Sequence, residues 1–185
     1  MPLSRRDLPN LITIFRFCMV PPVVWLLLHE SFAMALILFA VAGFTDALDG
    51  LLAKRYDWTS QLGARLDPLA DKALLVSSYI ALGWLQIIPG WLVLLIIVRD
   101  VVILVGAITY YFHIEHVDAD PTFVSKLNTL VQILFVLAMV LNQGIWPLPP
   151  AWTPVLIYSV VATTILSGMD YVWTWGWRAW QKRRQ

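Results

Sequence analysis

Six long apolar segments fill most of this chain, and they restrict its fold more than any other feature. The segments lie at about 10–28, 32–53, 68–87, 90–112, 124–142 and 152–176. A helix needs about 20 mostly apolar residues to cross the hydrocarbon core of a bilayer. Within lipid, a helix also satisfies its backbone hydrogen bonds inside a single segment. The sequence therefore predicts an all-α polytopic membrane protein with six transmembrane helices.

The composition agrees with a membrane protein and argues against other classes. Apolar residues make up 59% of the chain and charged residues 14%, whereas about a quarter of the residues in a typical soluble domain are charged. The formal net charge is only +1, so no basic field points to a nucleic-acid partner. The sequence has no internal repeat and no long linker, so we expect one domain that covers residues 1–185.

The basic residues predict how the segments are oriented. If all six segments cross the bilayer, the flanking lysines and arginines fall on one side, namely Arg5, Arg6, Lys54, Arg55, Arg65, Lys72, Lys126, Arg178, Lys182, Arg183 and Arg184. The three opposite loops contain no lysine or arginine. Because basic residues concentrate on the cytoplasmic side of membrane proteins, we expect both termini to be cytoplasmic. We also expect a bacterial inner membrane, since no Arg- and Ser-rich transit extension is seen.

Four aspartates flank the break between the second and third segments. Asp46 and Asp49 are three residues apart near the end of the second segment, and Asp67 and Asp71 are four apart near the start of the third. Each spacing places a pair on one face of a helix. Consecutive antiparallel helices would bring the two pairs together at one membrane surface.

Carboxylates gathered in this way need positive charge between them, because a buried charge without a partner is costly. Oxygen ligands favour Mg²⁺ or Mn²⁺ over zinc, and two such cations suit phosphate chemistry. The alternative is that the aspartates pair with Arg55, Arg65 and Lys72 in a solvated belt. All four aspartates at these spacings, with the small residues Gly50, Ala53, Gly63 and Ala64 between them, favour the metal site.

This stretch resembles the CDP-alcohol phosphatidyltransferase family, whose signature reads D-x2-D-G-x2-A-R-x8-G-x3-D-x3-D. The chain matches it with the same gaps at Asp46, Asp49, Gly50, Ala53, Gly63, Asp67 and Asp71. Lys54 stands where the family has arginine. A planar guanidinium that can bind a phosphate through two hydrogen bonds is thus replaced by an ammonium group that acts as a point charge. The opening segment from Leu8 to Arg16 and the six-segment pattern also look like the family.

The resemblance implies a donor, a metal site and a reaction. CDP-diacylglycerol would be the donor, the four aspartates would bind two divalent cations, and Asp71 would also act as general base while CMP leaves. Donor-binding residues would be Asn10, Thr13, Gly50, Ala53, Lys54 and Gly63. The resemblance also implies a homodimer.

Two acceptors fit the family. Phosphatidylglycerol would make the chain a cardiolipin synthase, and glycerol 3-phosphate would make it a phosphatidylglycerophosphate synthase. Glycerol-phosphate enzymes tend to carry a second arginine eight residues after the position of Arg99, where this chain has Ala107. We therefore favour phosphatidylglycerol, with Arg99 and Lys126 as acceptor-binding residues.

Some charged residues have structural alternatives. Arg99 could simply pair with Asp100 or Asp170, and Lys126 could be an interfacial anchor. Arg16 could either contact substrate or extend to the membrane surface.

Two other classes remain as alternatives at this point. An intramembrane prenyltransferase also binds diphosphate through aspartate-rich helices, but it usually has two such clusters and more spans. A cation transporter commonly shows repeated halves and helices broken at mid-membrane, whereas these aspartates lie near one surface.

Overall fold

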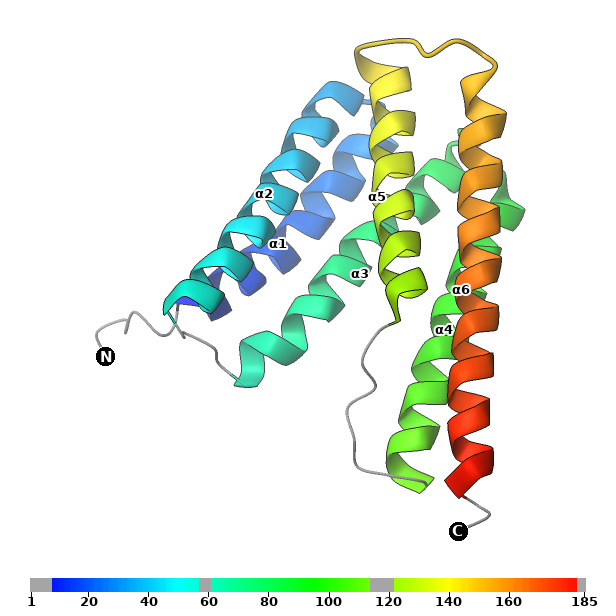
Figure 1. Ribbon diagram of the computed structural model, residues 1–185. Coiled ribbons are helices and arrows are strands. Elements are labelled where there is room, and N and C mark those ends of the chain that lie inside the picture. Colours follow the sequence, from blue (N-terminus) through cyan, green and yellow to red (C-terminus); the bar gives the residue numbers. More distant parts are fainter. Residues whose placement is uncertain (1–7, 57–60, 114–121, 183–185) are drawn as a thin grey trace. The chain divides into compact units, whose positions relative to one another are not determined.

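The computed structural model describes residues 8–56, 61–113 and 122–182, and within these ranges it contains six α-helices and no strand. The helices are α1 (Leu8–Leu28), α2 (Phe32–Tyr56), α3 (Gln61–Trp84), α4 (Gly90–His113), α5 (Phe123–Gly144) and α6 (Trp152–Lys182) (Figure 1). Side chains are described for residues 14–45, 69–109 and 122–174. The all-α prediction and the six helical segments are confirmed.

Two helix ends are closed by residues in the left-handed conformation. Glu30 has φ 58° and Gln86 has φ 57°. After α1, the amide of Ser31 donates to the carbonyl of Leu26 at 2.9 Å. After α3, the amide of Ile87 donates to the carbonyl of Leu82 at 3.0 Å. These bonds form Schellman motifs, which satisfy the last carbonyls of each helix, and the second one explains why α3 ends before the predicted residue 87.

The chain forms two compact units. The first contains residues 1–87 and 136–147, and the second contains residues 88–135 and 148–185. Helix α5 therefore contributes its C-terminal half to the first unit and its N-terminal half to the second.

In the first unit, α1 packs against both α2 and α3. Ala42 on α2 and Ala70 on α3 are fully buried, and such small residues let helices in lipid approach closely. Helix α1 continues through Pro21 and Pro22, which membrane helices tolerate where neighbouring groups satisfy the freed backbone.

In the second unit, α4 and α6 pack side by side. Arg99 contacts Ser167, and Gly106 further along α4 lies against the Tyr171 ring further along α6. Because both sequence positions increase together, the two helices run parallel. This agrees with the predicted topology, in which both helices cross in the same direction.

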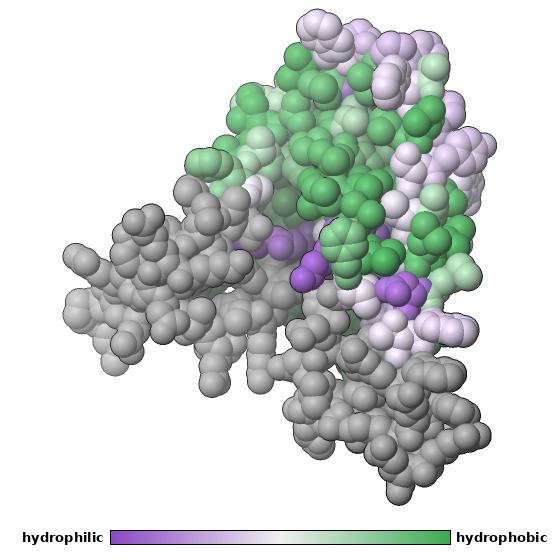
Figure 2. All heavy atoms as spheres, viewed as in Figure 1, coloured by the Kyte–Doolittle hydropathy of each residue, from purple (hydrophilic) through white to green (hydrophobic). Residues whose placement is uncertain are grey.

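Three helical stretches among the described residues are long and apolar enough to cross a bilayer, namely Gly90–Thr109, Phe123–Gly144 and Trp152–Thr174. Two shorter apolar stretches are Ile14–Leu28 and Phe32–Thr45. Large apolar side chains are exposed along these helices, and they dominate much of the coloured surface in Figure 2. Exposed apolar surface of this extent suits contact with lipid, while crossing by all six helices stays a prediction.

Gly144, at the end of α5, offers a test of packing within the first unit. A Cβ atom there would lie 2.7 Å from the Cβ of Phe32 and 2.9 Å from the backbone nitrogen of Ala33. Because backbone atoms cannot easily give way, we expect Gly144→Ala to destabilise the fold by about 1–3 kcal/mol. Thermal unfolding in one detergent would measure the loss.

The matched control is Gly43→Ala on α2, where a Cβ atom would meet nothing within 4 Å. We expect this change to leave the melting temperature unaltered or slightly raised, because alanine favours a helix over glycine. Equal melting temperatures for the two variants would contradict the close approach of Gly144 to α2.

Candidate functional site

The structure places all predicted metal ligands and donor-binding residues on three helices of one compact unit. Asn10 and Thr13 lie on α1, and Asp46 to Lys54 lie on α2. Gly63, Asp67 and Asp71 lie on α3. The helical backbone through both aspartate pairs confirms the spacing argument, since residues three or four apart share a face. Of these side chains, only that of Asp71 belongs to the described part.

Asp71 forms an ion pair with Arg16, and this contact joins α3 to α1. The Nη1 atom of Arg16 donates to the Oδ1 atom of Asp71 at 2.6 Å. The Arg16 side chain is 1% exposed and that of Asp71 is 44% exposed. The guanidinium is thus buried in the helix packing, while part of the carboxylate stays accessible.

The sequence left the role of Arg16 undecided, and the structure shows that it does not extend to a surface. A buried guanidinium requires charged or hydrogen-bonding partners. Here the Nη1 atom of the guanidinium has as its partner one of the four aspartates of the signature. In the sequence, Arg16 is an arginine within an apolar segment. Such a residue is expected to have a polar partner, but the sequence does not show which residue that is.

The residues at this place carry the kind of ligand atoms that the predicted divalent-cation site requires. Aspartate supplies oxygen ligands, which Mg²⁺ and Mn²⁺ prefer. Both aspartate-bearing helices pack against α1, and Asp71 keeps an accessible carboxylate edge. Among the side chains that the structure describes, no three His, Cys, Asp or Glu residues cluster closely enough to hold a metal; those of Asp46, Asp49 and Asp67 lie outside this set.

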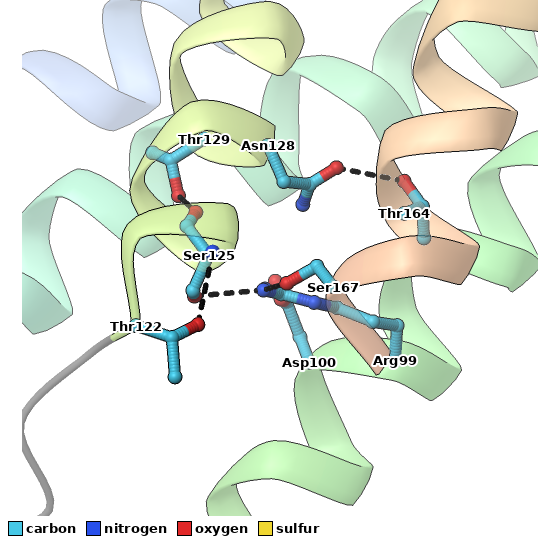
Figure 3. Close-up of polar contacts among 8 residues, drawn as sticks. All are labelled: Arg99, Asp100, Thr122, Ser125, Asn128, Thr129, Thr164 and Ser167. Atoms are coloured by element: carbon cyan, nitrogen blue, oxygen red, sulfur yellow. Dashed lines mark hydrogen bonds and ion pairs between the residues drawn. The ribbon is translucent and has the colours of Figure 1, made fainter. Parts of the chain in front are cut away.

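A second polar site surrounds Arg99 in the other unit (Figure 3). Its Nη1 atom donates to the Oδ1 atom of Asp100 at 2.8 Å. Its Nη2 atom donates to the Oγ atom of Ser125 on α5 at 2.8 Å and also to the Oγ atom of Ser167 on α6. The Arg99 residue is 7% exposed. The guanidinium is therefore fixed by contacts to three helices.

These contacts decide between the partners expected for Arg99. The pairing with Asp100 is confirmed. The described bonds of Arg99 do not include Asp170, whose Oδ2 atom is buried without a hydrogen-bond partner among the described residues. The pairing with Asp100 does not use the Nε atom of Arg99, which is buried and also has no described partner.

A further buried contact lies beside Arg99. The Oγ1 atom of Thr164 on α6 donates to the Oδ1 atom of Asn128 on α5 at 3.1 Å (Figure 3).

The start of α5 is capped by Thr122, whose Oγ1 atom accepts a hydrogen bond from the amide of Ser125 at 3.2 Å. This cap fixes the turn that carries Ser125.

Sequence reasoning missed Ser125, Asn128 and Ser167. The signal was present, because Ser125, Asn128 and Gln132 recur at helical spacing within an apolar segment. Lys126, the other predicted acceptor residue, is exposed near the start of α5.

Comparison with known proteins assigns the family. The profile of the CDP-alcohol phosphatidyltransferase family matches residues 6–166. The chain therefore belongs to the CDP-alcohol phosphatidyltransferase family, as the resemblance of its aspartate signature indicated.

Relatives named for both candidate activities match the chain. It is 41% identical to rat cardiolipin synthase (CMP-forming) over 150 residues, which cover 71% of this chain and 49% of the rat protein. It is 34% identical to a probable phosphatidylglycerophosphate synthase of Mycobacterium tuberculosis over 172 residues, which cover 90% of this chain and 80% of that protein. The chain spans about half the length of the rat protein and of the human cardiolipin synthase.

The contact between Arg16 and Asp71 can be tested by a double-mutant cycle. We expect Arg16→Ala and Asp71→Asn to be non-additive in unfolding free energy, with a coupling of about 0.5–3 kcal/mol, because the two side chains touch. Denaturant unfolding in detergent would measure it. Arg16→Ala combined with Glu30→Gln is the control, since Glu30 is exposed beyond the end of α1, roughly 20 Å from Arg16 at the rise of a helix, and that pair should be additive. Additivity in both pairs would contradict the contact.

Proposed function

We propose that this chain is an integral membrane enzyme that transfers a phosphatidyl group from CDP-diacylglycerol to an alcohol, with release of CMP. One observation carries the proposal. The aspartate signature of a phosphatidyltransferase family lies on two helices that pack against α1, and the last aspartate is held by a buried arginine. The prenyltransferase and transporter alternatives have no comparable support, because the family profile covers most of the chain.

The reaction needs a base at the attacking hydroxyl. The oxygen of the acceptor hydroxyl forms a bond to the phosphorus that carries diacylglycerol. The bond from that phosphorus to the CMP oxygen breaks, and the hydroxyl proton passes to Asp71. Arg16 holds one oxygen of this carboxylate at 2.6 Å, so the other oxygen has a fixed direction. A positioned base typically contributes about 10²–10⁴-fold to the rate.

The four aspartates Asp46, Asp49, Asp67 and Asp71 would hold two divalent cations, either Mg²⁺ or Mn²⁺. When bound, the cations neutralise the diphosphate and the charge that develops on the leaving oxygen. Proposed donor contacts are those of Asn10, Thr13, Gly50, Ala53, Lys54 and Gly63. The small residues leave space for the nucleotide, and Lys54 supplies a positive charge to a phosphate.

Phosphatidylglycerol is the acceptor that we propose, which makes the chain a cardiolipin synthase. Rat and human relatives bear that name. Arg99 is buried in a polar network. Residue 107 is alanine, whereas glycerol-phosphate enzymes of the family tend to carry a second arginine there, so a small dianionic acceptor would lack one cation. Lys126 would meet the acceptor phosphate at the membrane surface. The name of the mycobacterial relative supports glycerol 3-phosphate as the second candidate.

The remaining parts of the proposal rest on the basic residues and on family resemblance. We place six crossings with both termini in the cytoplasm, because the flanking basic residues would then share one side. The aspartate site then faces the cytoplasm. We also propose that the protein forms a homodimer and that it resides in a bacterial inner membrane.

A product assay tests the reaction and the acceptor together. Purified protein with Mn²⁺ and CDP-diacylglycerol would receive radiolabelled phosphatidylglycerol in one tube and radiolabelled glycerol 3-phosphate in another. We expect labelled cardiolipin in the first tube. Phosphatidylglycerophosphate in the second tube alone would overturn the acceptor, and no CMP in either tube would overturn both candidate activities.

The same assay tests the base. We expect Asp71→Asn to lower kcat by at least about 100-fold, because an amide cannot accept the hydroxyl proton. Glu30→Gln is the matched control, since Glu30 is an exposed carboxylate in the turn after α1. Gel filtration would establish that both variants remain folded. Turnover of Asp71→Asn close to that of the control would contradict the role of Asp71.

A further inference from the structure

The pair of Arg16 and Asp71 joins a buried cation to a partly accessible anion. The Arg16 side chain is 1% exposed, and its Nη1 atom lies 2.6 Å from the Oδ1 atom of Asp71, whose side chain is 44% exposed. Water therefore reaches the carboxylate but not the guanidinium. Because buried charges are screened far less than exposed ones, Arg16 acts strongly on any ion that binds Asp71.

Lys72 lies next to Asp71 in the sequence, but its charge acts differently. Lys72 is exposed, so water and salt screen its ammonium group. Arg16 is enclosed where α1 packs against α3, so its guanidinium cannot withdraw into water when a second cation arrives. Among the described side chains of the first unit, Arg16 is thus the buried positive charge that the aspartate site must accommodate.

A carboxylate that is shared between two cations binds each of them less tightly. Within the ion pair, the charge of Asp71 is already balanced by Arg16. A divalent ion that uses Asp71 as a ligand adds positive charge beside a fixed guanidinium, and like charges repel strongly where the dielectric constant is low. The diphosphate of a CDP-lipid is anionic, so its arrival would offset this repulsion.

We propose that Arg16 keeps the aspartate site from filling with divalent cations until the donor is bound. The proposal rests on the phosphatidyl transfer proposed above, and it concerns the order in which that site is loaded. Arg16 lowers the affinity of the donor-free site for cations, and the diphosphate of CDP-diacylglycerol restores it. Cations and donor then bind cooperatively, and each raises the affinity for the other by the same factor.

A Mn²⁺ titration measures this cooperativity without turnover. The protein would be placed in phosphatidylcholine nanodiscs with or without CDP-diacylglycerol and with no acceptor, and free Mn²⁺ would be followed by electron paramagnetic resonance. Nanodiscs without protein would correct for ions that the lipids bind alone. We expect the donor to lower the dissociation constant of Mn²⁺ for the wild type by about 5–150-fold, the usual range of coupling between two ligands.

Two variants separate the charge of Arg16 from its packing. Arg16→Met removes the charge from a side chain of similar length, and the fold should tolerate it because the partner Asp71 is partly exposed and stays hydrated. A neighbouring charge changes the affinity of a carboxylate for a proton by about 10–1000-fold. We therefore expect Arg16→Met to bind Mn²⁺ at least about tenfold more tightly than the wild type when the donor is absent.

Arg16→Lys is the matched control, because it alters the packing but keeps the positive charge. Its donor-free affinity for Mn²⁺ should stay close to that of the wild type. Gel filtration would establish that both variants remain folded.

Three results would overturn the proposal. Donor-free binding by Arg16→Met that is no tighter than in the wild type would show that Arg16 only holds the carboxylate in place. Equal tightening in Arg16→Met and Arg16→Lys would assign the effect to packing. A wild-type dissociation constant that the donor leaves unchanged would exclude the cooperativity. If no form bound Mn²⁺ even with the donor, the proposed cation site itself would fail, so the two failures are distinguishable.

Discussion

The ion pair between Arg16 on α1 and Asp71 on α3 is the contact on which the proposed site depends. The arginine is almost completely buried, and a guanidinium in that position must have a partner. Its partner, Asp71, belongs to the aspartate signature. The same ion pair therefore holds α1 against α3 and fixes the orientation of the carboxylate that we propose as the base. Fully buried Ala70, one residue earlier on α3, removes the bulk that would hold helices apart.

The second unit meets the same requirement in another way. Arg99 bonds to Asp100 on its own helix and to serines on α5 and α6, so its charge is balanced without the aspartate signature. One unit therefore carries the proposed transfer chemistry, and the other carries the features that we assign to the acceptor lipid.

The sequence predicted the helices well and the side-chain partners poorly. Hydrophobic length located all six helices, but the third begins at Gln61 instead of 68, because its first turns are polar and fall outside an apolar window. The end of α3 depends on the left-handed turn at Gln86. Glycine usually occupies such a position, so the glutamine gave no signal of the turn. The partner of Arg16 and the serines around Arg99 depend on contacts between distant segments, which spacing within one helix cannot specify. The aspartate signature was readable because its spacing is local.

Mn²⁺ binding followed by electron paramagnetic resonance is the most direct test of the central claim, that the aspartates of α2 and α3 form a divalent-cation site. The protein in lipid nanodiscs with CDP-diacylglycerol should bind two Mn²⁺ ions per chain, close enough for their spins to couple. Asp49→Asn should remove the coupled signal. A chain that binds no Mn²⁺, or an Asp49→Asn variant with an unaltered coupled spectrum, would contradict the account.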